Sequence, residues 1–98
     1  MSKNSLFTKL EDIPNIGKAM VGDFKLLGIT TPEQLKSQNG YDLYNKLCHK
    51  TKTRHDPCVI DTFLAAVDFM NGAPKRPWWH YTKQRKADLN KNPNLVDV

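Results

Sequence analysis

The stretch "IPNIGKAMVGDFKLLGI", residues 13–29, contains the turn and the apolar spacing that decide how the chain folds. Asn15 and Gly17 flank one apolar residue, Ile16, in a short turn, and asparagine tolerates the left-handed backbone conformation better than most residues with a side chain. Apolar residues then recur at helical spacing until Gly28, a residue type that often ends a helix. We therefore predict a tight turn and a helix that begins at Gly17 and stops at Gly28.

Helical spacing marks most of the remaining chain, whereas strand signals are nearly absent. Thr31 and Gln34 fit a capping box, and Asp56 is suited to cap the apolar segment that follows it. The other predicted helices span residues 6–13, 31–37, 41–51, 56–70 and 77–90. These patterns predict an all-α fold of five to six short helices, in which the helix at 56–70 is the most buried.

The last predicted helix opens with Pro77 and the pair Trp78 and Trp79. Large aromatic residues at the start of a terminal helix more often pack than bind a ligand, so we expect both tryptophans to dock this helix on the core. A base-stacking role is the less favoured alternative. Residues 1–90 are predicted to form a single domain, and residues 91–98 a flexible C-terminal tail.

Composition limits the classes of protein to which the chain can belong. It has 98 residues, of which 39% are hydrophobic and 26% charged, as is typical of one small globular domain. No apolar run approaches the roughly 20 residues that cross a bilayer, and the first ten residues lack the apolar core of a signal peptide. We therefore expect a cytoplasmic protein without a membrane partner, whose two cysteines are reduced.

Positive charge is concentrated in two segments. The net charge is +5, and residues 46–54 and 75–86 contain four and five Lys or Arg residues, respectively, and no acidic residue. Such segments favour polyanionic partners, although each also fits an ordinary solvated face. The sequence does not indicate an oligomeric state.

The order of helix, turn and helix around Gly17 resembles the helix-hairpin-helix motif of DNA-binding proteins. Val21 and Phe24 stand at the two apolar positions of that motif and Gly28 at its terminal glycine, while Asn15 replaces the first glycine. In such hairpins the apolar residue of the turn, here Ile16, packs back between the two helices.

The helices at 41–51 and 56–70 would form a second, degenerate hairpin, with 31–37 as the connector. This is the five-helix arrangement of paired helix-hairpin-helix domains, a SAM-domain-like core to which the Trp-led helix is added at the C-terminus. The second turn lacks glycine, so Lys52 and Arg54 would bind by their side chains and face the same polyanion as the first turn.

The resemblance implies that the first turn binds a DNA phosphate. The first backbone N–H groups of a helix lack intrahelical acceptors and lie at the positive end of its dipole, so they attract anions. We expect a small residue at Gly17 to be needed for the turn and for the approach of phosphate, while Lys18 adds charge. Such contacts position DNA without reading its sequence. The predicted nucleic-acid-binding residues are Asn15, Ile16, Gly17, Lys18, Lys52 and Arg54.

Three separated blocks, "IPNIGKAMVGDFKLLGI", "RHDPCVIDTF" and "VDFMNGAPKRPWW", resemble the small bacterial family of pathogenicity locus proteins, some of which are labelled mitomycin resistance proteins. The similarity covers about residues 10–86, and the mitomycin label hints at DNA damage. We therefore predict a DNA-binding protein without sequence preference, linked to DNA damage or repair. Asp23 stands where DNA-binding hairpins often have a basic residue, so a protein-protein interaction module with purely structural hairpins stays open as the alternative.

The sequence also contains cysteine, histidine and aspartate residues that could form a metal site or a reactive thiol. The candidate zinc ligands are Cys48, His55, Cys58 and His80. Their spacing fits no standard zinc motif, so we predict no metal and no cofactor. Cys58 lies in the first turn of a helix near His55, which could lower its thiol pKa, but a structural cysteine is favoured. Asp61 and Asp68 are expected to anchor Arg54 or a helix terminus, and we expect no enzymatic activity.

Overall fold

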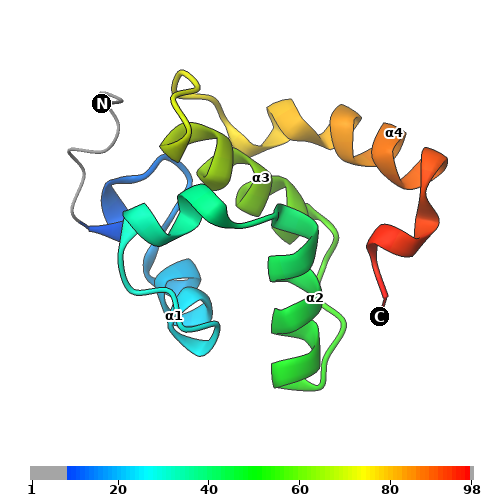
Figure 1. Cartoon of the computed structure of the whole chain (residues 1–98), viewed down its shortest axis with the longest axis horizontal. Coiled ribbons are helices and arrows are strands. Elements are labelled where there is room, and N and C mark those ends of the chain that lie inside the picture. Colours follow the sequence, from blue (N-terminus) through cyan, green and yellow to red (C-terminus); the bar gives the residue numbers. More distant parts are fainter. Residues whose placement is uncertain (1–8, 98) are drawn as a thin grey trace.

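The computed structural model describes residues 9–97, and this part of the chain contains helices and no strand (Figure 1). In chain order the elements are η2 (Leu10–Asp12), α1 (Lys18–Leu26), η3 (Pro32–Ser37), α2 (Gly40–Thr51), α3 (Cys58–Met70), η4 (Trp78–Tyr81), α4 (Thr82–Lys91) and η5 (Pro93–Leu95), where η denotes a 3-10 helix. The predicted all-α fold is confirmed. Of the helix expected at 6–13, only the 3-10 turn η2 is seen, and residues 6–8 lie outside the described residues. None of the described helices is long and apolar enough to span a bilayer.

Helix α1 has the boundaries that the opening stretch predicts. Gly28 adopts a φ of 79° just after the helix. Its N–H donates to the carbonyl of Lys25 at 3.0 Å, and the N–H of Ile29 donates to the carbonyl of Phe24 at 2.8 Å. These two bonds form a Schellman motif, which is accompanied by the burial of Phe24 and Ile29. The glycine therefore ends the helix and turns the chain back toward the core.

The capping residues predicted for the next elements are confirmed in part. Gln34 reaches back, and its side-chain oxygen accepts from the backbone N–H of Thr31 at 2.9 Å. The segment forms the 3-10 helix η3 rather than an α-helix. Asp56 accepts from the N–H of Cys58 at 2.8 Å, as expected for a residue that caps α3.

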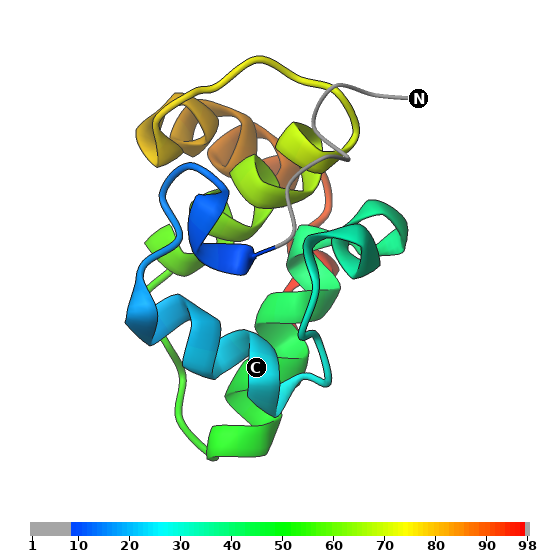
Figure 2. The same cartoon turned by 90° about the vertical axis from the view of Figure 1, so that its left-hand side faces the viewer.

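Helix α3 forms the centre of the structure, as the run of apolar residues predicts. Seven of its residues are buried, including Phe63, whose ring lies 5.4 Å from that of Phe24 on α1. Helices α2 and α4 and the 3-10 helices η3 and η4 all pack against α3 (Figures 1 and 2). Gly40 permits the close approach of α2, because an added Cβ atom would lie 2.8 Å from the side chain of Leu64.

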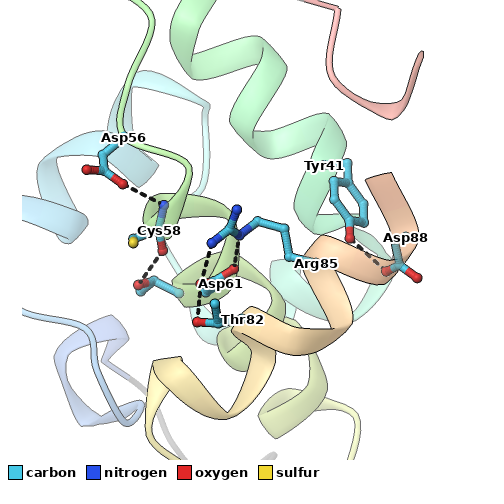
Figure 3. A network of polar contacts seen from close by, with 8 residues as sticks. Tyr41, Asp56, Cys58, Asp61, Thr82, Arg85 and Asp88 are labelled. Carbon is cyan, nitrogen blue, oxygen red and sulfur yellow. Dashed lines mark hydrogen bonds and ion pairs between the residues drawn. The ribbon is translucent and has the colours of Figure 1, made fainter. Parts of the chain in front are cut away.

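A buried carboxylate attaches α4 to α3. Asp61 has no exposed surface; it accepts from the Arg85 Nε at 2.6 Å and from the Thr82 Oγ1 at 2.7 Å (Figure 3). Asp61 does anchor a helix terminus, since Thr82 is the first residue of α4, but its charged partner is Arg85 and not Arg54. Sequence spacing could not identify these partners because they are more than twenty positions away.

A second polar contact connects α4 to α2. The Tyr41 hydroxyl donates to the Asp88 Oδ2 at 2.7 Å (Figure 3). Burial, reinforced by this hydrogen bond, raises the pKa of Tyr41 well above its usual value. The hydroxyl therefore stays protonated and remains a donor throughout the physiological pH range.

The C-terminal part of the chain departs from two expectations. Trp79 does not dock on the core, because it is 63% exposed, and Trp78 is only half-buried. The aromatic residue that enters the core from this segment is Tyr81. Residues 92–97, expected to form a loose tail, lie against α2 instead, where the Asn45 side chain donates to the Leu95 carbonyl at 2.8 Å and accepts from the Asp97 N–H at 3.2 Å.

We predict that Arg85→Ala lowers the free energy of unfolding by about 3–5 kcal/mol, because it leaves the Asp61 carboxylate buried without its cation. Lys86→Ala, an exposed change one position along α4, should stay within about 0.5 kcal/mol of the wild type. Urea denaturation of both variants measures the difference. Equal stabilities would show that the Asp61–Arg85 pair does not hold α4.

Candidate nucleic-acid interface

The turn before α1 is built as its sequence suggests. Asn15 has a φ of 72°, so asparagine does occupy the left-handed position. Ile16 is buried, and its N–H donates to the Ile13 carbonyl at 3.2 Å. The Asn15 side chain also donates to the Arg76 carbonyl at 2.9 Å. The turn is therefore anchored twice, by Ile16 in the core and by Asn15 on the segment that leads to η4.

The backbone conformation of Gly17 does not require a small residue, contrary to the expectation for this turn. Its φ of −101° and ψ of −174° are extended backbone angles that any residue adopts. A Cβ atom added at Gly17 would meet no heavy atom within 4 Å. Neither backbone strain nor packing requires glycine at this position. The missing side chain therefore affects only how closely a ligand can approach the turn from solvent.

Among residues 9–97, no side chain is seen to cap the start of α1, whereas the starts of α2 and α3 are capped. Asn39 caps α2 by accepting from the N–H of Tyr41 at 2.9 Å, and Asp56 caps α3. At α1 the cap residue is Gly17, which offers no side-chain acceptor, and the first turn contains no acidic residue. The first N–H groups of an α-helix have no intrahelical acceptor. Those of α1 therefore face a position where an anion could accept from them.

The second predicted binding turn lies between α2 and α3. Lys52 and Arg54 are both exposed. Lys52 ends α2 with a φ of 54°, a left-handed conformation that costs a residue with a Cβ about 1 kcal/mol. In Figure 2, α1 and α3 begin at the same edge of the molecule, and Figure 1 shows that the two starts are separated along its long axis. The structure thus brings both turns to one side without bringing them into contact.

The structure adds two basic residues that the site prediction omitted. A groove of about 890 Å³ runs beside the first turn and is lined by residues 11–17, Phe69 and residues 75–77. Lys75 and Arg76 contribute positive charge to it, while Glu11 and Asp12 contribute negative charge. The basic segment 75–86 was visible in the sequence, but only the hydrogen bond from Asn15 shows that it reaches the turn.

The surroundings of Cys58 disfavour its thiolate form. A hydrogen bond from the thiol to Asp56, together with partial burial, raises the pKa of Cys58 above its ordinary value. His55 turns to Thr51 instead, with 2.8 Å between the His55 Nε2 and the Thr51 Oγ1. Within residues 9–97, no three His, Cys, Asp or Glu side chains are grouped so that they could hold a metal ion.

Comparison with known proteins gives a family and one named relative. The family described as "Pathogenicity locus" matches residues 3–87 of the chain. The mitomycin resistance protein McrB of Streptomyces lavendulae is 40% identical over 80 residues, which are 82% of this chain and 76% of that protein. No solved structure matches. The matched region contains both turns and the segment 75–77.

We predict that Asn15→Ala destabilises the protein by about 1–2 kcal/mol, because alanine is strained at a positive φ and loses the bond to the Arg76 carbonyl. Asn15→Gly removes only the bond, so thermal unfolding should place it between Asn15→Ala and the wild type. If Asn15→Ala matches the wild type, the left-handed turn is absent in solution.

We also predict that iodoacetamide modifies Cys58 more slowly than a free cysteine at neutral pH. Asp56→Asn keeps a capping side chain but removes the negative charge, so the thiol pKa should fall and the rate should rise. Mass spectrometry of the alkylated peptides measures both rates, with the buried Cys48 as internal reference. Faster modification of wild-type Cys58 than of a free cysteine would contradict the structure.

Proposed function

The chain belongs to the pathogenicity locus family, and we propose that it binds duplex DNA through the phosphate backbone, without sequence preference. The single observation that carries this proposal is the open start of α1 behind Gly17. A phosphate placed there would accept from the first N–H groups of the helix, at the positive end of the helix dipole. Lys18 is exposed next to this position and supplies a counter-charge.

We further propose that the five elements from η2 to α3 form a paired helix-hairpin-helix. The turn at Asn15–Gly17 would be the first hairpin turn and the loop between α2 and α3 the second. The second turn binds differently, because Asp56 already accepts from the first amide of α3. Its contribution comes from the exposed side chains of Lys52 and Arg54. Two anchoring points on one side suit an extended polyanion better than a small anion.

The acidic residue in α1 does not oppose this proposal strongly. Asp23 is the sixth residue of the nine-residue helix. A helix rises 1.5 Å per residue, so the backbone of Asp23 lies roughly 7–8 Å along the axis from the start of α1. Charges at that separation near water interact weakly at physiological ionic strength. The relative's name, a mitomycin resistance protein, is compatible with a role at damaged DNA.

The second candidate is a protein-protein interaction module, and one observation favours it. Leu26 and Trp79 are large apolar residues that are exposed to 50% and 63%, respectively, and either could contact a partner protein. In this case the hairpins would only pack, and removing charge at the turns would leave the partner bound. Salt dependence separates the two candidates, because binding to DNA phosphates weakens steeply as salt rises.

We predict that Lys18→Ala weakens binding to duplex DNA by a similar factor for all sequences. The slope of log affinity against log salt should shrink by about one unit, since one phosphate contact is lost. Lys91→Ala is the matched control, because Lys91 is exposed at the end of α4, far from α1 (Figure 1). Fluorescence anisotropy of labelled duplexes at several salt concentrations measures both slopes. Identical slopes for Lys18→Ala and Lys91→Ala would place the phosphate elsewhere.

Gly17→Ser and Lys52→Gly separate binding from folding. Serine at an N-cap accepts from the first amides, so Gly17→Ser should leave or raise the melting temperature while it competes with phosphate and weakens DNA binding. Lys52→Gly relieves the left-handed conformation, so stability should rise by about 1 kcal/mol while affinity falls. If wild-type protein shows no salt-dependent binding to duplex DNA at low ionic strength, the DNA proposal is wrong.

A further inference from the structure

Trp79 is a large aromatic residue that the fold leaves in solvent. It is 63% exposed, although Tyr81, two positions further on, is buried. Its ring contacts that of Trp78 almost perpendicularly, with centroids 5.7 Å apart and an interplanar angle of 85°. A perpendicular neighbour covers at most one face of a ring. At least one face of the Trp79 indole is therefore not covered by Trp78, while the contact restrains its orientation.

The chain around Trp79 is basic. Residues 75–86 contain five Lys or Arg and no acid. Arg85 is neutralised by Asp61, whereas Lys75, Lys83 and Lys86 are exposed and take part in none of the ion pairs found among residues 9–97. An aromatic face beside unpaired cations matches single-stranded nucleic acid, in which bases stack and phosphates need counter-charge. An apolar protein surface would leave these cations without partners.

The Trp79 surface adjoins the turn at which we propose that phosphate binds. The Asn15 side chain holds the Arg76 carbonyl at 2.9 Å, and the turn and residues 75–77 line the same groove. In Figure 2, η4 lies at the same edge of the molecule as the start of α1. A nucleic-acid chain that leaves the turn can therefore follow Lys75 toward Trp79.

We infer that Trp79 stacks on an unpaired base of DNA whose duplex part is held at the Gly17 turn. The preferred ligand is then a duplex that continues into a single-stranded segment, rather than a fully paired duplex. This inference rests on the proposed function, which it narrows to one class of DNA. Because Trp79 is exposed, it does not have the packing role that its position in the sequence suggested.

The test compares a blunt duplex with the same duplex carrying a short single-stranded overhang, bound to the full chain. The wild type should bind the overhang form more tightly than the blunt duplex. Trp79→Ala should weaken binding to the overhang form at least about fivefold, as expected for the loss of one stacked base. Affinity for the blunt duplex should not change. The salt slope should also stay the same for Trp79→Ala, because no charge is lost, but shrink by about one unit for Lys75→Ala.

Two controls isolate stacking from charge and from general apolar contact. An overhang of abasic nucleotides keeps every phosphate but has no base, so it should bind wild type as weakly as the normal overhang binds Trp79→Ala. Leu26→Ala removes another exposed large apolar side chain and should leave both affinities unchanged. In Trp78→Phe protein, the remaining tryptophan fluorescence should be quenched by the normal overhang and not by the abasic one.

The outcomes distinguish this inference from the proposed function. If Trp79→Ala and wild type bind the overhang form equally, or if the abasic overhang binds as well as the normal one, the stacking inference is overturned while duplex binding at the turn stands. If blunt duplex does not bind but single strands bind through Trp79, base stacking at Trp79 stands, whereas the proposed duplex binding at the Gly17 turn fails, and with it the preference for a duplex with an overhang. If neither form of DNA binds, both are wrong.

Discussion

The architecture depends on the ion pair between Asp61 and Arg85. Asp61 lies on the most buried helix, where an unpaired carboxylate would cost several kcal/mol. Arg85 and Thr82 satisfy it from α4, a helix none of whose residues is itself fully buried. Apolar contact alone would hold α4 weakly. The ion pair therefore fixes α4 on α3, while the buried Tyr81 holds η4, which precedes α4, against the core.

The candidate interface joins two parts of the chain that are distant in sequence. Asn15 supplies the left-handed turn and, through its amide, the contact to the Arg76 carbonyl. Gly17 then starts α1 with an extended backbone and no side chain above the first amides. Asn39 and Asp56 cap the starts of α2 and α3, and α4 continues directly from the 3-10 helix η4, whereas α1 starts after an extended residue that has no side chain.

Local signals in the sequence predicted local structure well, and distant partners poorly. Gly28, Gln34 and Asp56 act through neighbours within a few residues, so their helix boundaries could be predicted. Asp61 could be recognised as unusual on an apolar helix, but its partner depends on how α4 packs. The prediction that both tryptophans dock on the core failed for a related reason, since helical spacing does not decide whether Tyr81 or Trp79 enters the core. At the turn, residue types predicted the left-handed Asn15 correctly but assigned a conformational need to Gly17 that its φ does not support.

The separation in sequence between Asp61 and Arg85 also constrains the order in which the chain can fold. During synthesis α3 is made before its partner residues on α4, which lie 21 and 24 positions further along the chain than Asp61. Until then the Asp61 carboxylate has no cation and must stay hydrated, which keeps that side of α3 open to water. The side of α3 around Asp61 is covered only when the C-terminal helix is present. A chain that ends before α4 therefore leaves this carboxylate without its cation, and the surface that α4 covers stays open to water.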